Sequence, residues 1–199
     1  MCKTIITTIM VLALTVNANL IVNSGFEDPA VTATAYNLTG TDIPGWVIPD
    51  GYAVDLAHPS DKWVAASGDQ SLALNALTYG KITQQIATIP QAIYELTFMY
   101  AGNPAIEGGI AKTLVTAAGS SQQYDFDTTG YTHADMGWTQ QVLVFAATDN
   151  VTTVSFESLI DGINSPAIDD VSVVMTQIPE PAAIAILAIG GLFIRRKRI

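Results

Sequence analysis

The segment Ile93-Tyr94-Glu95-Leu96-Thr97-Phe98-Met99-Tyr100 decides the fold class of this chain of 199 residues. Its large apolar side chains alternate with polar or smaller ones, which is the two-residue period of a half-buried β-strand. Aromatic and β-branched residues also suit a pleated surface that is buried on one face. We therefore predict a strand here, with Tyr94 and Phe98 facing a core.

The same kind of pattern recurs along most of the chain, and no window shows a convincing helical period of 3.6 residues. Turn signals such as Asp50-Gly51 and Gly102-Asn103-Pro104 separate the apolar stretches. Further strands are predicted at 52–56, 71–74, 81–86, 111–116, 139–146, 152–157 and 167–175. About eight strands without βαβ alternation predict an all-β jelly-roll sandwich.

The N-terminus has the features of a signal peptide. Lys3 gives a positive start, residues 4–15 are mostly apolar, and Ala18 offers a small residue at the cut. A permanent N-terminal anchor is the alternative, but the apolar run is short for one. Cleavage after Ala18 would remove Cys2, the only cysteine, so the exported protein would have no disulfide.

The C-terminus carries a second processing signal in three parts: Pro179-Glu180-Pro181, an apolar run over 182–194, and Arg195-Arg196-Lys197-Arg198. As a helix the apolar run would reach about 20 Å, short of the roughly 30 Å hydrocarbon core, and the basic cluster would hold it from the cytoplasmic side. This order resembles the PEP-CTERM sorting signal of Gram-negative bacteria. The resemblance implies export, transient insertion in the inner membrane, and cleavage near Pro-Glu-Pro by an exosortase.

Residues 19–178 remain as one domain between the two signals, 1–18 and 179–199. This domain contains three lysines against seventeen carboxylates, a formal charge of −14. Such acidity argues against nucleic acid, whose binding depends on basic residues. A neutral glycan, or an acidic one bridged through calcium, is compatible with it. A salt-adapted surface would need no ligand.

The domain contains several characteristic sequence segments, including 19–27, Ile43-Pro44-Gly45-Trp46, and Ala167-Ile168-Asp169-Asp170-Val171. In this order the segments resemble bacterial choice-of-anchor proteins and their relatives in plant cell walls, whose DUF-type domains are galactose-binding-like β-sandwiches. The resemblance spans nearly all of 19–176. It implies a noncatalytic, extracellular domain associated with polysaccharide, at the cell surface or in the extracellular matrix.

The resemblance also implies one structural calcium ion, because similar carbohydrate-binding jelly rolls place calcium where the first strand meets the last. On this chain Glu27 and Asp169 would be its ligands. Neighbouring strand residues point to opposite faces, so only one of Asp169 and Asp170 is expected to serve. The alternative is that Glu27 caps backbone amides and the aspartates are solvated.

Aromatic side chains near loops are the expected sugar contacts, because a pyranose presents an apolar face that stacks on Trp or Tyr. These candidates are Trp63, Tyr79, Tyr124, Tyr131 and Trp138. Trp46, in a Pro-Gly turn, is expected in the core instead. Gln84, Gln85 and Asn103 are candidates for hydrogen bonds to a ligand.

The chain contains no nucleophile elbow, no His-Glu-x-x-His helix and no phosphate loop. We therefore predict a protein that is not an enzyme. A glycosidase needs only two placed carboxylates, so a glycan hydrolase stays as an alternative. A structural matrix or biofilm protein without specific sugar binding is the other.

Overall fold

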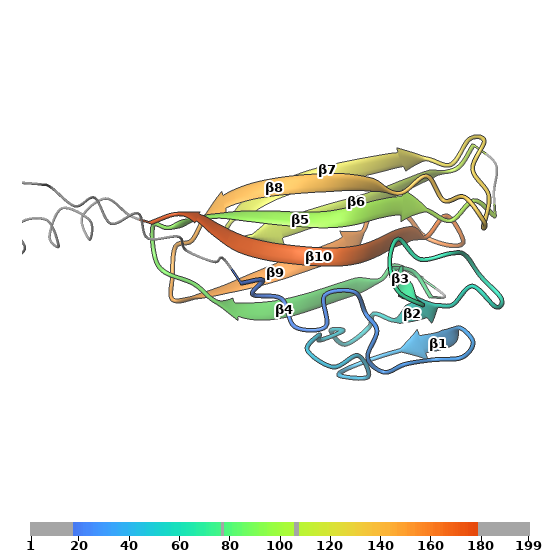
Figure 1. The fold of residues 1–199 in the computed structure, drawn as a ribbon, viewed down its shortest axis with the longest axis horizontal. Helices are drawn as coiled ribbons and strands as arrows, with labels where there is room; N and C mark the ends of the chain where they lie inside the picture. The colour runs from blue at the N-terminus through green and yellow to red at the C-terminus, as the bar shows by residue number, and fades with distance from the viewer. Residues whose placement is uncertain (1–17, 77, 106–107, 179–199) are drawn as a thin grey trace, which may run out of the picture.

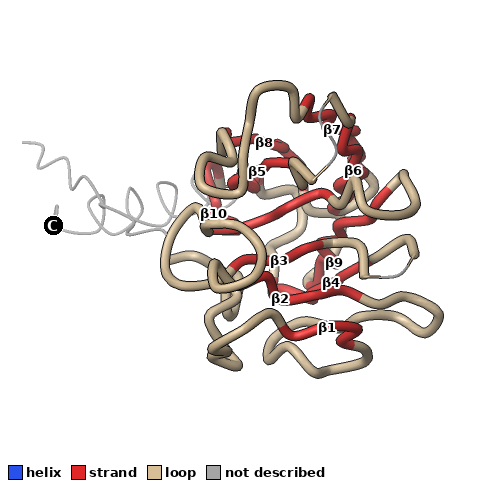
Figure 2. The backbone as a smooth tube through the Cα atoms, turned by 90° about the vertical axis from the view of Figure 1, so that its right-hand side faces the viewer, coloured by secondary structure: helices blue, strands red, loops and turns tan. Residues whose placement is uncertain are grey.

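A computed structural model describes residues 18–76, 78–105 and 108–178, and within these ranges the regular structure consists of strands alone (Figure 2). The strands are β1 (Ala35–Leu38), β2 (Val54–Ala57), β3 (Ser71–Ala73), β4 (Lys81–Ala87), β5 (Ile93–Gly102), β6 (Ile110–Ala117), β7 (Ser120–Asp127), β8 (Thr139–Ala146), β9 (Val151–Ser158) and β10 (Pro166–Gln177). The prediction of an all-β protein is confirmed.

The strands form two antiparallel sheets. One has the order β1-β2-β3-β10-β5-β8, and the other has the order β4-β9-β6-β7. In Figure 1 the strands of both sheets run between two ends of the molecule, and long loops gather at the right-hand end. The last strand of the chain, β10, pairs with both β3 and β5. It therefore lies in the interior of the larger sheet.

The space between the sheets is filled by a chain of aromatic contacts. Phe26 stacks on Trp46 with ring centroids 5.4 Å apart, Trp46 meets Phe156 at 6.2 Å, and Phe156 meets Phe98 edge-on at 5.1 Å. Such pairs contribute about 0.5–1.5 kcal/mol each beyond their burial. Trp46, Tyr94 and Phe98 are all buried, so the prediction that they belong to the core is confirmed.

The sequence patterns did not predict β1 and β7. Along β7 the only buried side chains are Tyr124 and Phe126, because this strand lies at the edge of its sheet and exposes its serine, glutamine and aspartate side chains. β1 is four residues long and contains Asn37 in the left-handed region, with φ 60°. Both strands therefore lack the sustained apolar alternation that marks the others.

The last strand, β10, runs from one end of the sandwich to the other. β5 ends and β10 begins at the right-hand end of Figure 1, and β10 then runs 12 residues to the left-hand end, roughly 40 Å at about 3.3 Å per residue. Ile178, the last residue described, lies there. The predicted signal peptide, apart from the exposed Ala18, and the sorting segment 179–199 lie outside the described residues. Within the described part of the chain, no helix is long and apolar enough to cross a membrane.

Candidate functional site

A pocket of about 260 Å³ lies at the end of the sandwich where β5 ends and β10 begins. We call it pocket A. Its polar lining includes Tyr36, Asn37, Asp55, Lys62, Asn75 and Asn103. These residues come from β1, from β2, and from the segments that follow β2, β3 and β5, so the order of the larger sheet brings them together.

A partly buried ion pair forms one side of pocket A. Lys62 Nζ lies 2.7 Å from Asp55 Oδ2, and the two side chains are 18% and 4% exposed. Asp55 Oδ1 accepts a hydrogen bond from the backbone N–H of Asn37 at 2.9 Å, so both carboxylate oxygens have partners. An ammonium has three N–H donors, and Lys62 therefore keeps donors that a ligand can use.

Tyr36 supplies the aromatic surface of pocket A and is 53% exposed. Lys62 Nζ lies 4.9 Å from the centroid of its ring, and its hydroxyl donates to Asp61 Oδ2 at 3.3 Å. Hydrogen bonds from the Thr34 hydroxyl and backbone N–H hold the pKa of Asp61 below its usual value. Partial burial and the charge of Asp61 raise the pKa of Tyr36. The phenol is thus kept neutral beside an ionised carboxylate.

Asn75 carries an unsatisfied acceptor at this pocket. Its Nδ2 donates to the carbonyls of Ile160 and Gly162, which fixes the orientation of the amide, and its backbone N–H donates to Ser165 Oγ. The Oδ1 atom is buried and has no hydrogen-bond partner. A buried acceptor without a donor costs about 1–3 kcal/mol. Because the Oδ1 atom is itself buried, it belongs to the polar wall of pocket A and is not an exposed contact for a ligand.

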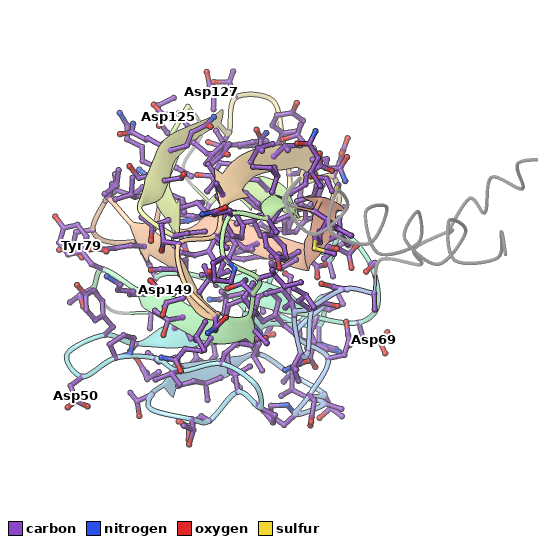
Figure 3. All side chains as sticks on the ribbon, turned by 90° about the vertical axis from the view of Figure 1, so that its left-hand side faces the viewer. Asp50, Asp69, Tyr79, Asp125, Asp127 and Asp149 are labelled. Carbon is purple, nitrogen blue, oxygen red and sulfur yellow. The ribbon has the colours of Figure 1, made fainter. Side chains whose placement is uncertain are left out.

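A second polar centre lies where the start of the domain meets β10. We call Glu27, Asp169 and Asp170 the acidic junction. Glu27 Oε1 accepts from the backbone N–H groups of Asp69 and Gln70 at 2.9 and 3.2 Å. Asp169 Oδ2 accepts from those of Ala66 and Ser67 at 3.0 and 3.1 Å. The loop before β3 is thereby tied to both the first and the last segments of the domain, and Figure 3 shows Asp69 of this loop at the surface.

A bulge in β10 turns the side chains of both Asp169 and Asp170 toward Gly25. The register with β5 shifts between Asp169 and Ser172, and Asp170 has φ 47°. A methyl group on Gly25 would lie 3.8 Å from Asp169 Oδ1 and 3.6 Å from Asp170 Oδ1. Strict alternation therefore fails at the bulge, although Asp169 is buried and Asp170 exposed.

The donor set of the acidic junction suits a hard cation, because it consists of carboxylate oxygens. The described lysines pair elsewhere, with Asp55, Glu157 and Asp125. Burial raises the pKa of Asp169 to about 7, as expected for a carboxyl group without a counter-charge. Among the described residues no three His, Cys, Asp or Glu side chains form a ready-made metal site, so calcium would also need backbone carbonyls or water.

Two of the aromatic residues that the sequence placed at the surface are buried, and for these the expectation is wrong. Trp63 is 1% exposed because its ring lies in the core and its Nε1 donates to Ser71 Oγ. Tyr124 points inward from β7, packs edge-on against Phe98, and donates to the Val142 carbonyl. Neither ring face is open to a sugar.

The other predicted contacts have separate positions. Trp138 is half-buried and donates to the Val64 carbonyl. Tyr131 is 37% exposed and rests on Phe126, whereas Tyr79 is 47% exposed at the edge of the molecule in Figure 3. Gln84 is buried and bonds both the N–H and the carbonyl of Val22, so it holds the start of the domain instead of facing a ligand. Of the predicted residues, only Asn103 lines pocket A.

Sequence reasoning missed Tyr36, Lys62 and Asn75. Tyr36 lies on the short strand that was not predicted, and Asn75 follows β3 without any motif. One signal was available for Lys62, since it is one of three lysines among seventeen carboxylates in the domain. A lysine in such an acidic domain indicates that a nearby carboxylate requires a positive partner, as Lys62 provides for Asp55.

Comparisons with known proteins give a family and a fold. The model of the family described as "Protein of unknown function (DUF642)" matches residues 19–174. No curated protein sequence matches the chain.

Several solved structures are similar in fold. The carbohydrate-binding module TmCBM61, solved with β-1,4-galactotriose, is 17% identical, with a TM-score of 0.51 over 80% of this chain and 99% of its own. A cyclase from Fischerella sp. TAU is 14% identical, with a TM-score of 0.58 over 82% and 99%. At these identities the likeness shows a shared fold, which hosts both binding modules and enzymes.

Proposed function

This chain belongs to the DUF642 family, and we propose that it is an exported, noncatalytic protein that binds extracellular polysaccharide through pocket A. One observation carries the proposal. The exposed ring of Tyr36 lies at a pocket that is also lined by the ammonium of Lys62 and by the exposed side-chain amide of Asn37. An aromatic face, a hydrogen-bond donor and an acceptor are the groups that a sugar ring requires.

The size and charge of pocket A indicate the kind of sugar. Its volume of about 260 Å³ is below the about 300–1,000 Å³ of sites for drug-sized ligands, which suits one sugar ring at the end of a chain. Lys62 is already neutralised by Asp55, and the domain around it is strongly acidic. A neutral terminal sugar therefore fits better than a uronic acid.

The single carboxylate among the described residues that line pocket A favours binding over catalysis. A glycosidase needs two carboxyl groups on opposite sides of the scissile bond. Among the described residues that line pocket A, Asp55 is the one carboxylate, and both of its oxygens are bonded to the protein.

The acidic junction would hold one structural calcium ion in this proposal. Glu27 Oε2 and Asp170 Oδ2 accept no hydrogen bond within the described residues, and Asp169 lacks a counter-charge. Calcium would supply positive charge and fix the loop before β3 to the start of the domain and to β10.

The sorting segment 179–199 would place the protein at the surface or in the extracellular matrix of a Gram-negative-type bacterium, after export, membrane insertion and exosortase cleavage. Pocket A lies at the start of β10, and Ile178 follows the last residue of this strand. β10 runs along the length of the sandwich (Figure 1). A molecule attached through its C-terminus would thus hold pocket A roughly 40 Å away from the attachment point, where polysaccharide can reach it.

Electrophoresis in gels that contain neutral polysaccharides tests the proposal. Galactan, xylan, mannan and a mixed-linkage β-glucan would be used, and at least one should retard the purified protein. Tyr36→Ala should weaken the retardation about tenfold, a loss of about 1.4 kcal/mol. Tyr131→Ala is the matched control, since it removes an exposed tyrosine that does not line pocket A.

The outcomes separate the alternatives. Weaker retardation of Tyr131→Ala, with Tyr36→Ala unchanged, would reject pocket A as the site. No retardation in any of the four gels would favour a structural matrix protein without specific sugar binding. Release of reducing sugar from the gel polysaccharides would support the glycan hydrolase.

A further inference from the structure

A larger pocket of about 540 Å³ lies at the same end of the sandwich as pocket A, and we call it pocket B. Its lining includes Tyr52 before β2, Thr78 and Tyr79 before β4, and Glu157 and Leu159 at the end of β9. Its volume is within the range of about 300–1,000 Å³ that is usual for ligand sites. It has room for more than one sugar ring.

Two residues that line pocket B, Tyr52 and Glu157, contact a lysine in the way that Tyr36 and Asp55 do in pocket A, although Lys81 lies behind this lining and not in it. Lys81 Nζ lies 2.7 Å from Glu157 Oε2 and 5.9 Å from the centroid of the Tyr52 ring. In pocket A the corresponding distances are 2.7 Å from Lys62 to Asp55 and 4.9 Å from Lys62 to the Tyr36 ring. Two of the three lysines of the domain are thus used in the same way, each beside a carboxylate and above a tyrosine.

Tyr79 gives pocket B an additional aromatic surface. Its side chain is 47% exposed, and Leu159 beside it is 38% exposed. Within the described residues, Tyr79 forms neither a ring pair nor a side-chain hydrogen bond. An exposed aromatic ring that lines the same pocket as the Glu157 carboxylate matches the requirements of a sugar ring, whose apolar face stacks while its hydroxyls bond.

One wall separates the two pockets. The loop between β3 and β4 gives Asn75 to pocket A and Tyr79 to pocket B, and the loop between β9 and β10 gives Ile163 to pocket A and Leu159 to pocket B. The Nδ2 of Asn75 joins these two loops through the carbonyls of residues 160 and 162.

From this arrangement we infer that pocket B is a second carbohydrate site, specific for a neutral oligosaccharide of two or more rings. The inference rests on the proposed function. One molecule would hold two glycan segments, one on each side of the wall, and would cross-link polysaccharide chains. Two modest sites on one molecule would also bind a polymer more tightly than either site alone.

Calorimetric titration of the full chain in detergent tests the inference. The probes are four neutral trisaccharides: β-1,4-galactotriose, xylotriose, cellotriose and mannotriose. We expect at least one of them to bind with a stoichiometry near two. Tyr79→Ala and Tyr36→Ala should each reduce it to about one, and the double variant should show no binding. Ile89→Ala is the control, since it removes a side chain that is 49% exposed on the segment between β4 and β5 and should keep both sites.

Each result has a defined meaning. A stoichiometry near one that Tyr79→Ala leaves unchanged and Tyr36→Ala abolishes would overturn the second site but keep the proposed function. Absence of heat with all four trisaccharides would overturn both. Circular dichroism of the variants would verify that each one is folded.

Discussion

The acidic junction and pocket A both contain an aspartate buried in the protein, but they balance its charge in different ways. Asp55 in pocket A is paired with Lys62 at 2.7 Å. Asp169 in the acidic junction accepts hydrogen bonds from three backbone N–H groups and has other carboxylates nearby. A buried charge is costly unless it is paired. The charge of Asp55 is therefore balanced within the fold, whereas the acidic junction still needs a proton or a cation.

The largest effect is expected from Asp169→Ala. The partly buried backbone N–H groups of Ala66, Ser67 and Asp170 would lose their acceptor, and a donor left unpaired away from water costs about 1–3 kcal/mol. Urea unfolding should show a loss of about 3 kcal/mol or more. Asp170→Asn is the control, because asparagine tolerates the left-handed conformation at this position. If the two variants lost the same stability, Asp169 would not be the central group of the junction.

Calcium should have the next largest effect if it balances the junction. A ligand at a hundred times its dissociation constant stabilises a protein by about 2.7 kcal/mol, and a domain of this size gains about 2–4 °C in Tm per kcal/mol. Thermal unfolding with millimolar calcium should thus occur roughly 5–10 °C higher than with a chelator. The Glu27→Gln variant should lose most of this difference. An identical midpoint with and without calcium would remove the metal from the proposal.

Without calcium, the pH dependence of stability should identify the proton as the substitute. The pKa of Asp169 is raised by burial to about 7, against about 3.9 in an unfolded chain. Between these values the folded protein binds the proton and the unfolded chain does not, so stability falls as the pH rises from about 4 to about 7. With a chelator present, the Tm at pH 5 should exceed that at pH 7.5 by several degrees. Asp169→Asn should flatten this slope, and a slope that persists would have to come from another group.

Sequence reasoning predicted the two regions unequally, for physical reasons. The segments 19–27 and 167–171 contain recognisable motifs, so Glu27 and Asp169 could be predicted as neighbours. The bulge that also turns Asp170 toward Gly25 could not be predicted. No such motif marks the residues of pocket A. Its residues are brought together by sheet order, because β2, β3 and β10 are adjacent only in the folded structure.

The exposure of individual aromatic side chains was also predicted poorly. Trp63 and Tyr124 lie beside loops in the sequence but face the core. Tyr124 points inward because the register of β7 sets the direction of its side chain. Trp63 lies in the loop between β2 and β3, which folds its ring into the core where Nε1 donates to Ser71 Oγ. The strongly alternating strands were predicted well, as 139–146 is identical to the observed β8. Polar edge strands such as β7 lack that signal.

The smallest effects concern the lysine pairs, and they sharpen the contrast between a paired and an unpaired aspartate. Lys62→Met would leave Asp55 buried without its cation, and we expect a loss of about 2 kcal/mol, since breaking a buried pair is costly. Lys81→Met should cost at most about 1 kcal/mol, because Lys81 and Glu157 are 28% and 31% exposed. Urea unfolding of both variants measures the difference.

A double variant decides whether Lys62 acts on Asp55 by its charge. Lys62→Met combined with Asp55→Asn removes both charges, while the new amide oxygen can still accept from the N–H of Asn37. The double variant should be more stable than Lys62→Met alone, because no uncompensated charge stays buried. Equal stability of the two would mean that Lys62 contributes through packing on Tyr36 and Trp63. In that case calcium at the junction and lysine in the pocket would not be two solutions to one electrostatic problem.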